Sequence, residues 1–231
     1  MFNLTISSFK TVFKKRPNKD RLWIILMILV FSIPTIVDAG YGIIGFMFYR
    51  LQYKISTETY GHLISLWFVV NFFSQIVAVP FLSKTLKCRD TTILLLAFAP
   101  AVIGFLGEAF FTDVRALFVI WSVFFILYFN VFTTTRSAMS KLLDPTEIGK
   151  AFSVLGVLES FLALVSKPFY GFMYQASLDV FTGLWIVVSV GFITIAMIIA
   201  IVLHFGMKKS DKTLSKGAEN FQHEEIETKF A

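Results

Sequence analysis

Charged residues are scarce in this sequence of 231 residues, because Asp, Glu, Lys and Arg together make up only 16% of it. An average soluble domain carries about a quarter. Apolar residues make up 56% of the chain, with 28 Phe among them. A soluble fold would leave much of this apolar surface in water, at roughly 25 cal/mol per Å². The composition therefore excludes an ordinary soluble domain and indicates a protein embedded in lipid.

Cysteine is nearly absent as well, since Cys88 is the only one. An intramolecular disulfide and a thiolate metal cluster are therefore excluded. The sequence also lacks the buried Gly-x-Ser-Gly site of an intramembrane serine protease, the arginine-rich helix of a voltage sensor and the repeated Pro-x-Asp signature of mitochondrial carriers. We expect no enzymatic activity, no catalytic residues, no metal and no cofactor.

Six apolar runs follow one another along the chain, and each is long enough to cross a bilayer. The hydrocarbon core is about 30 Å thick and needs roughly 20 helical residues. The runs cover 22–49, 61–82, 91–111, 116–135, 148–174 and 181–205. The sequence therefore predicts an all-α integral membrane protein, with a six-helix transmembrane bundle over 21–207.

The distribution of basic residues predicts the orientation of this bundle. Most of the 21 Lys and Arg residues lie before the first run, in the second and fourth linkers, and after the last run. The alternate loops keep only Arg50, Lys54 and Arg115. Cytosolic loops carry such an excess of positive charge. We expect both termini in the cytosol, the lipid bilayer as partner and no nucleic acid.

The two ends of the chain differ from the bundle. In residues 1–20, apolar side chains recur at helical spacing opposite lysines, which predicts a cytosolic amphipathic linker lying on the membrane surface. Residues 208–231 contain few apolar side chains and mix lysines with glutamates. This composition is typical of a disordered cytosolic tail.

Polar side chains inside the predicted spans are the candidate site residues, because such groups are costly in lipid and mark substrate or proton pathways. They occur in the first, second, fourth and fifth runs, and an arginine ends the fourth. They are Asp38, Asn71, Gln75, Asn130, Arg136, Glu159 and Lys167.

Each candidate also has a structural interpretation. Asn71 and Gln75 could equally hold helices together by hydrogen bonds. Asp38 and Lys167 could pair as a structural salt bridge. Glu159 has no obvious partner, which makes it the candidate for protonation. Glu108 lies near a helix end, where it is expected to reach the headgroups.

The order of polar and apolar helices repeats. The first and second runs of each triplet carry polar residues, whereas the third is apolar at its centre. This order predicts a 3+3 inverted repeat whose third helices are outer supports facing lipid.

The linker 136–150 forms a local motif. Asp144 can cap the next helix, Pro145 fits its first turn, and Glu147 completes a capping box. Gly149 allows close approach to a neighbour. Arg136 and Lys141 sit where a moving bundle would meet headgroups or acidic partners, or they could simply be positive-inside anchors around a capped turn.

The same linker resembles the major facilitator superfamily, in particular its proton-coupled folate transporter and thymic stromal cotransporter group. The resemblance to the later six helices of those twelve-helix carriers covers nearly the whole chain and is most specific over 136–153. The matching residues are Arg136, Ser140, Lys141, Leu142, Glu147, Gly149, Phe152 and Ser153. The loop 83–90 keeps the basic character of the superfamily's inter-helix motif but lacks its glycines.

The resemblance implies the C-terminal half of a secondary transporter, which takes up a small organic, folate-like anionic solute with protons by alternating access. Arg136 would lie near the proton or substrate path. The alternative is a non-transporting six-helix membrane protein that pairs with or regulates a full-length carrier. Because a carrier binds its solute between two halves, we expect a missing N-terminal six-helix half or a second copy as partner. The expected location is the plasma membrane rather than the lysosomal membrane.

Overall fold

The computed structural model describes residues 8–12, 14 and 20–230, with side chains up to Lys208, and this part of the chain contains helices and no strand. Residues 8–12 form a short helix, and the main helices follow from Asp20. They are α2 (Asp20–Gln52), α3 (Thr57–Phe73) with the π-helical turns η2 (Ser74–Ala78) and η3 (Phe81–Thr85), α4 (Asp90–Phe110), α5 (Val114–Val119) with the π-helical turn η4 (Ile120–Phe124), α6 (Asn130–Ser140), α7 (Pro145–Ser177) and α8 (Leu184–Phe230).

Five of the six predicted spans are single apolar segments of membrane length in the described chain. They are Asp20–Gln52, Thr57–Thr85, Asp90–Phe110, Pro145–Ser177 and Leu184–Lys208. Polar residues start several of them. Ser56 caps α3, where its Oγ accepts a hydrogen bond from the Thr59 N–H at 3.1 Å. Pro145 begins α7 at the position where its missing N–H is not needed. The prediction of an all-α membrane protein is confirmed.

The fourth predicted span differs from the continuous helix expected over 116–135. Helix α5 and η4 end at Phe124, residues 125–129 form a turn, and α6 begins at Asn130. Short-range backbone hydrogen bonds hold this turn, such as Tyr128 N–H to the Phe125 carbonyl at 3.1 Å. The segment contains no Gly or Pro to signal a break. Its aromatic side chains pack against α4, with Phe125 and Phe105 ring centres 4.7 Å apart, so tertiary packing accompanies the interruption.

The core lies between α2, α4 and α8. Half of the most apolar window of α4 is buried, against 17% in α3 and in α7. Trp185 of α8 is fully buried and contacts Tyr41 and Phe48 of α2, with ring centres 4.6 and 5.4 Å apart. The expectation that the third helix of each triplet serves only as an outer, lipid-facing support is therefore wrong. Helices α4 and α8 build the core, because they carry the small and apolar residues that pack closely.

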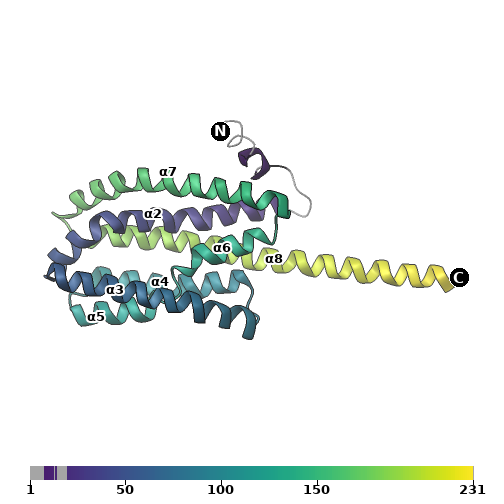
Figure 1. Ribbon diagram of the computed structural model, residues 1–231, viewed down its shortest axis with the longest axis horizontal. Helices are drawn as coiled ribbons and strands as arrows, with labels where there is room; N and C mark the ends of the chain where they lie inside the picture. The colour runs from purple at the N-terminus through teal and green to yellow at the C-terminus, as the bar shows by residue number, and fades with distance from the viewer. Residues whose placement is uncertain (1–7, 13, 15–19, 231) are drawn as a thin grey trace.

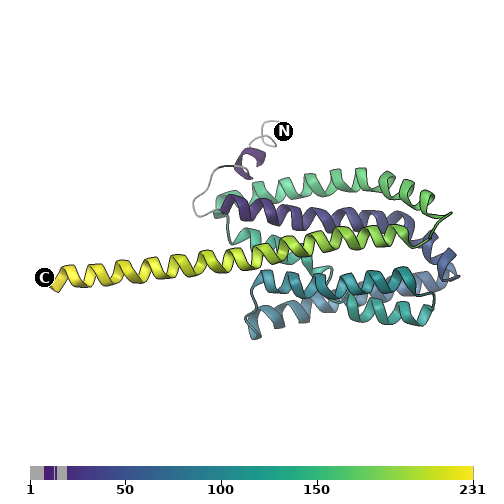
Figure 2. The same ribbon diagram turned by 180° about the vertical axis from the view of Figure 1, so that it is seen from behind.

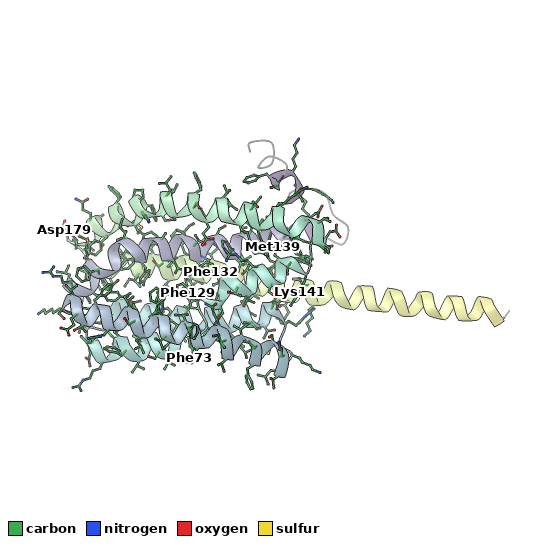
Figure 3. The ribbon with its side chains drawn as sticks, viewed as in Figure 1. Phe73, Phe129, Phe132, Met139, Lys141 and Asp179 are labelled. Carbon is green, nitrogen blue, oxygen red and sulfur yellow. The ribbon has the colours of Figure 1, made fainter. Side chains whose placement is uncertain are left out.

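Two faces of the bundle differ in what they present. Figure 1 shows α6 between α7 and α3 on the side toward the viewer, and Figure 3 shows Phe129 and Phe132 there. Figure 2 shows α8 running across the opposite side. We call the side formed by α3, α6 and α7 the open face. It carries the two least buried long helices.

Helix α2 begins, and α8 extends outward, at the same end of the bundle (Figure 1). Helix α8 continues as one helix to Phe230, through the segment for which the sequence predicts a disordered tail. No Pro interrupts this segment. The predicted amphipathic linker over 1–20 includes residues 1–7, 13 and 15–19, which lie outside the described residues. The proposed division of the chain at 20 and 207 stays a prediction.

Candidate functional site

An ion pair joins α6 to α7 on the open face. The Arg136 Nη2 donates a hydrogen bond to Glu159 Oε2 at 2.9 Å. The guanidinium also lies over the Phe31 ring of α2, 4.9 Å from the ring centre. The two charged side chains remain 39% and 49% exposed. The expectation that Glu159 has no partner is wrong, because the break before α6 and the packing of α6 on α7 bring Arg136 to it.

Lys167 lies further along α7, where its residue is exposed. The sequence leaves open a salt bridge between Lys167 and Asp38. No ion pair joins these two residues in the part of the chain that the structure describes. Asp38 instead lies against the Tyr128 hydroxyl, at the break of the fourth span. The two candidates therefore occupy different surroundings.

The polar candidates of α3, η2 and α6 differ in their surroundings: Asn71 and Asn130 are buried and hydrogen-bonded, whereas Gln75 is exposed. Asn130 Nδ2 donates to Ser74 Oγ at 2.6 Å, which joins α6 to η2 inside the bundle. Asn71 Nδ2 donates to the Trp67 carbonyl at 2.8 Å within its own helix. Gln75 is exposed and lines a groove of about 790 Å³ on the open face. Asn130 thus has the interhelical role that the sequence leaves open for Asn71 and Gln75.

A cavity of about 160 Å³ lies between α2, α3, α4 and the break of the fourth span. We call it the aromatic cavity, since most of its lining consists of Tyr, Trp and Phe rings. Its lining residues are Asp38, Tyr41, Gly42, Tyr49, Tyr60, Ile64, Trp67, Phe105, Glu108, Trp121, Phe125, Tyr128 and Phe129. No lysine or arginine is among them.

Glu108 lines this cavity, and its residue is only 1% exposed. Its carboxylate accepts hydrogen bonds from the Tyr41 hydroxyl at 3.0 Å and from Trp121 Nε1 at 3.3 Å. Tyr53 donates to the Glu108 main-chain carbonyl at 2.7 Å, and burial raises the pKa of the Tyr53 hydroxyl, which keeps it a donor. The expectation that Glu108 reaches the headgroups is wrong.

Sequence reasoning missed Glu108 because the residue stands near the end of its helix, where an acid usually needs no partner. The surrounding pattern offered one signal. Gly104 and Gly107 precede it on α4, and an added Cβ at these positions would meet Phe124 at 2.8 Å and Ile120 at 3.1 Å. Small residues of this kind let two helices approach closely. Here they bring Trp121 within reach of the carboxylate.

The linker between α6 and α7 is held by ion pairs to distant segments. Lys141 Nζ lies 2.6 Å from Asp90 Oδ2 at the start of α4. Lys14 Nζ lies 2.7 Å from Glu147 Oε1. The predicted capping box is wrong in part, because the side chain of Asp144 makes no capping hydrogen bond and Glu147 is engaged with Lys14.

Two further motif residues have local roles. Ser140 Oγ donates to the Ser137 carbonyl at 2.8 Å within α6. Gly149 is exposed, and a Cβ added there would meet nothing within 4 Å among the described residues. The expected close approach at Gly149 is therefore absent from the described chain. A neighbour could still approach it from outside this bundle.

These features define a class: a multi-pass membrane protein with a packed core on one side and charged residues on an uncovered face. No protein-family model matches the chain. It is similar at low identity to curated proteins of solute carrier family 46. Over 189 residues it is 22% identical to a Drosophila melanogaster protein named "Probable peptidoglycan muropeptide transporter", which covers 79% of this chain and 36% of that protein.

Two other relatives belong to the same family. Mouse solute carrier family 46 member 2 is 31% identical over 101 residues, which is 44% of this chain and 21% of the relative. A chicken protein named as a lysosomal proton-coupled steroid conjugate and bile acid symporter is 27% identical over 182 residues, which is 78% of this chain and 38% of the relative. The relatives are transporters, not enzymes. The chain is thus similar to one half of a solute carrier of the major facilitator superfamily and spans less than two fifths of each relative.

Proposed function

We propose that the chain supplies one half of a secondary-active transporter, and that its open face is one wall of the transport path. The observation that carries this proposal is the Arg136–Glu159 ion pair, which lies on α6 and α7 with both side chains partly exposed. Glu159 stands near the middle of the 33-residue helix α7. A charged pair at such depth is costly against lipid and usually faces a water-filled cavity or another protein.

An opposing wall would also cover the rest of the open face. The segment of α3, η2 and η3 and the helix α7 are the least buried long segments of the bundle. They carry the exposed polar residues Gln75, in η2, and Lys167, in α7. The relatives are much longer than the matched region. A preceding six-helix half fits this face best, and a second copy of the chain is the other occupant that symmetry allows.

The charges of the open face favour a solute with an anionic group. The Arg136 side chain is 39% exposed, and Lys167 is exposed on α7. Guanidinium groups bind carboxylates and sulfates through paired hydrogen bonds. The chicken relative is named for steroid conjugates and bile acids. We propose a small organic anion, with the folate-like anion implied by the sequence resemblance as one member of that class.

Glu159 is the proposed proton-coupling residue. Its carboxylate accepts the hydrogen bond from Arg136 at 2.9 Å. Protonation would remove the negative partner of the guanidinium and free it for the solute anion, so that proton and solute would bind together. The name of the chicken relative includes proton coupling for that protein. We propose that the carrier works in the plasma membrane, which cell fractionation would test. We also propose that both termini lie in the cytosol, which immunodetection of each terminus would test.

Reconstitution separates this proposal from the alternative of a non-transporting regulator. The purified chain is placed in liposomes alone, and also co-expressed with the six-helix half that precedes such a segment in a complete carrier. Radiolabelled bile acid and steroid sulfate serve as probes, under an inward proton gradient. We expect uptake only from the paired sample. Uptake by the monomeric chain alone would refute the half-transporter proposal, and no uptake by either sample would favour the regulator.

A further inference from the structure

The aromatic cavity is separate from the open-face ion pair, and its chemistry is opposite in charge. It holds two carboxyl groups, from Asp38 on α2 and Glu108 on α4, and no basic residue lines it. In the part of the chain that the structure describes, neither acid forms an ion pair. Glu108 is buried and Asp38 is partly buried. Two such acids without a cation suit a positively charged ligand when a second feature of the cavity also points to one.

The hydroxyl group of Tyr49 supplies that second observation. Tyr49 lines the cavity and is only 1% exposed, and its hydroxyl oxygen has no hydrogen-bond partner among the described residues. A buried hydroxyl left without a partner costs free energy, and a molecule or water bound in the cavity would satisfy it. The Tyr49 ring is held firmly, with ring centres 5.7 Å from those of Tyr60 and Trp121. The hydroxyl cannot easily turn elsewhere.

The aromatic walls decide which cation fits. Trp67 contacts Phe129 with ring centres 4.4 Å apart, and Trp121 lies 6.0 Å from Trp67. The faces of Trp and Tyr rings attract weakly hydrated organic cations, most strongly when water is excluded. A metal ion such as Ca²⁺ would instead need six to eight oxygen ligands, which two carboxylates and scattered hydroxyls do not supply. The volume of about 160 Å³ admits a group the size of a methylated ammonium.

We propose that the aromatic cavity is a subsite for an organic ammonium group, held by the carboxylates of Asp38 and Glu108, by the Tyr49 hydroxyl and by the surrounding Tyr and Trp rings. Tyr41 and Trp121 donate hydrogen bonds to Glu108 and so fix its orientation toward the cavity. The subsite is relevant to the transported solute only if the proposed function holds, and in this respect the inference rests on that proposal.

Binding is measured on the purified full chain in detergent, with tetramethylammonium chloride as the probe. The thermal unfolding temperature and the tryptophan emission report occupancy, since a ligand of the folded state raises the unfolding temperature and Trp67 and Trp121 line the cavity. We expect saturable effects beyond those of equal concentrations of sodium chloride. Neutral tert-butanol of similar size and the much larger tetrabutylammonium should give neither effect.

Three variants test the residues, and a fourth is the control. Asp38→Asn and Glu108→Gln should each raise the Kd for tetramethylammonium by about tenfold or more. Tyr49→Phe removes one oxygen only and should raise the Kd by about threefold. The control is Glu58→Gln, which changes an acid whose side chain is 85% exposed and which does not line the cavity; its Kd should equal that of the unmodified chain.

Two results would overturn the inference: no difference between tetramethylammonium and sodium chloride in the unmodified chain, or unchanged affinity in Tyr49→Phe and in each folded acid variant. If an acid variant fails to fold, the inference is tested by two remaining measurements. These are the comparison of tetramethylammonium with tert-butanol and tetrabutylammonium on the unmodified chain, and the Kd of Tyr49→Phe. Because this binding needs no transport, its absence would leave the carrier proposal standing. Absent uptake with binding intact would refute the carrier proposal alone.

Discussion

Arg136 and Glu159 stand 23 positions apart in the sequence, yet the guanidinium of the first donates to the carboxylate of the second at 2.9 Å. The pair links α6, which follows the break in the fourth span, to the middle of α7. It also lies on the face that the bundle leaves uncovered. A conformational change that separates α6 from α7 would break it, and in the proposed carrier the pair would couple solute binding to this movement.

In the proposed carrier, replacement of Arg136 by Ala should lower the uptake rate by about tenfold or more, because the proposed anion loses its charge-assisted partner. Both partners are partly exposed, so the stability cost should stay below about 1 kcal/mol. Uptake of radiolabelled bile acid and thermal unfolding are measured side by side. The control is Arg115→Ala, at an exposed position in the first turn of α5. Uptake equal in the two variants would reduce Arg136 to a topology anchor.

Replacement of Glu159 by Gln should flatten the pH dependence of uptake. The amide keeps the size of the side chain but cannot gain or lose a proton, so Arg136 would be free of a negative partner at every pH. We expect uptake at neutral pH to approach the level found at acidic pH. Initial rates measured across an acidic-to-neutral series check this. A profile like that of the unmodified carrier would discard the proton role of Glu159.

A cysteine on the open face should react with water-soluble reagents if that face lines an aqueous path. Ser160 on α7 and Ile198 on α8 are exposed in the bundle and lie on different helices. In a Cys88→Ser background, Ser160→Cys in native membranes should react with a charged methanethiosulfonate about tenfold faster than Ile198→Cys, since ionised reagents avoid hydrocarbon. Mass spectrometry after timed quenching gives both rates. Equal, slow reaction at the two positions would indicate that lipid covers both faces.

Helix α2 has two nearby glycines that should respond differently to an added methyl group. A Cβ at Gly40 would overlap the ring of Tyr170 on α7, whereas one at Gly42 would meet nothing within 4 Å. Gly40→Ala should therefore destabilise the bundle by about 1–3 kcal/mol through overpacking. It should also disturb the 2.9 Å hydrogen bond between Tyr170 and Ser189 of α8.

Gly42→Ala is the matched control, and it should leave stability unchanged or raise it by about 0.5–1 kcal/mol, because Ala favours a helix over Gly. Thermal unfolding of the two variants in the same detergent gives the comparison. Similar unfolding temperatures for both would mean that α2 and α7 pack less closely at Gly40 than the structure indicates.

The residues of the candidate site could be named from sequence more easily than they could be paired. Asp38, Arg136 and Glu159 stand out because ionisable groups inside apolar runs are rare. Their partners do not follow from this, since Arg136 reaches Glu159 and Asp38 lies against Tyr128 only after the helices pack. Glu108 escaped notice for the same reason. Its depth along α4 is ambiguous in the sequence, whereas the neighbouring helices bury it almost completely.

The sequence by itself determined that the chain is a multi-pass helical membrane protein, because hydropathy over about 20 residues is a local property and lipid admits helices whose backbone groups bond internally. Only the tertiary structure decided that the fourth span is broken at residues 125–129, that α4 and α8 form the core, and that α3, α6 and α7 are left open. These results depend on which side chains from distant segments meet. Aromatic packing and ion pairing between helices are long-range, and no single apolar run contains them.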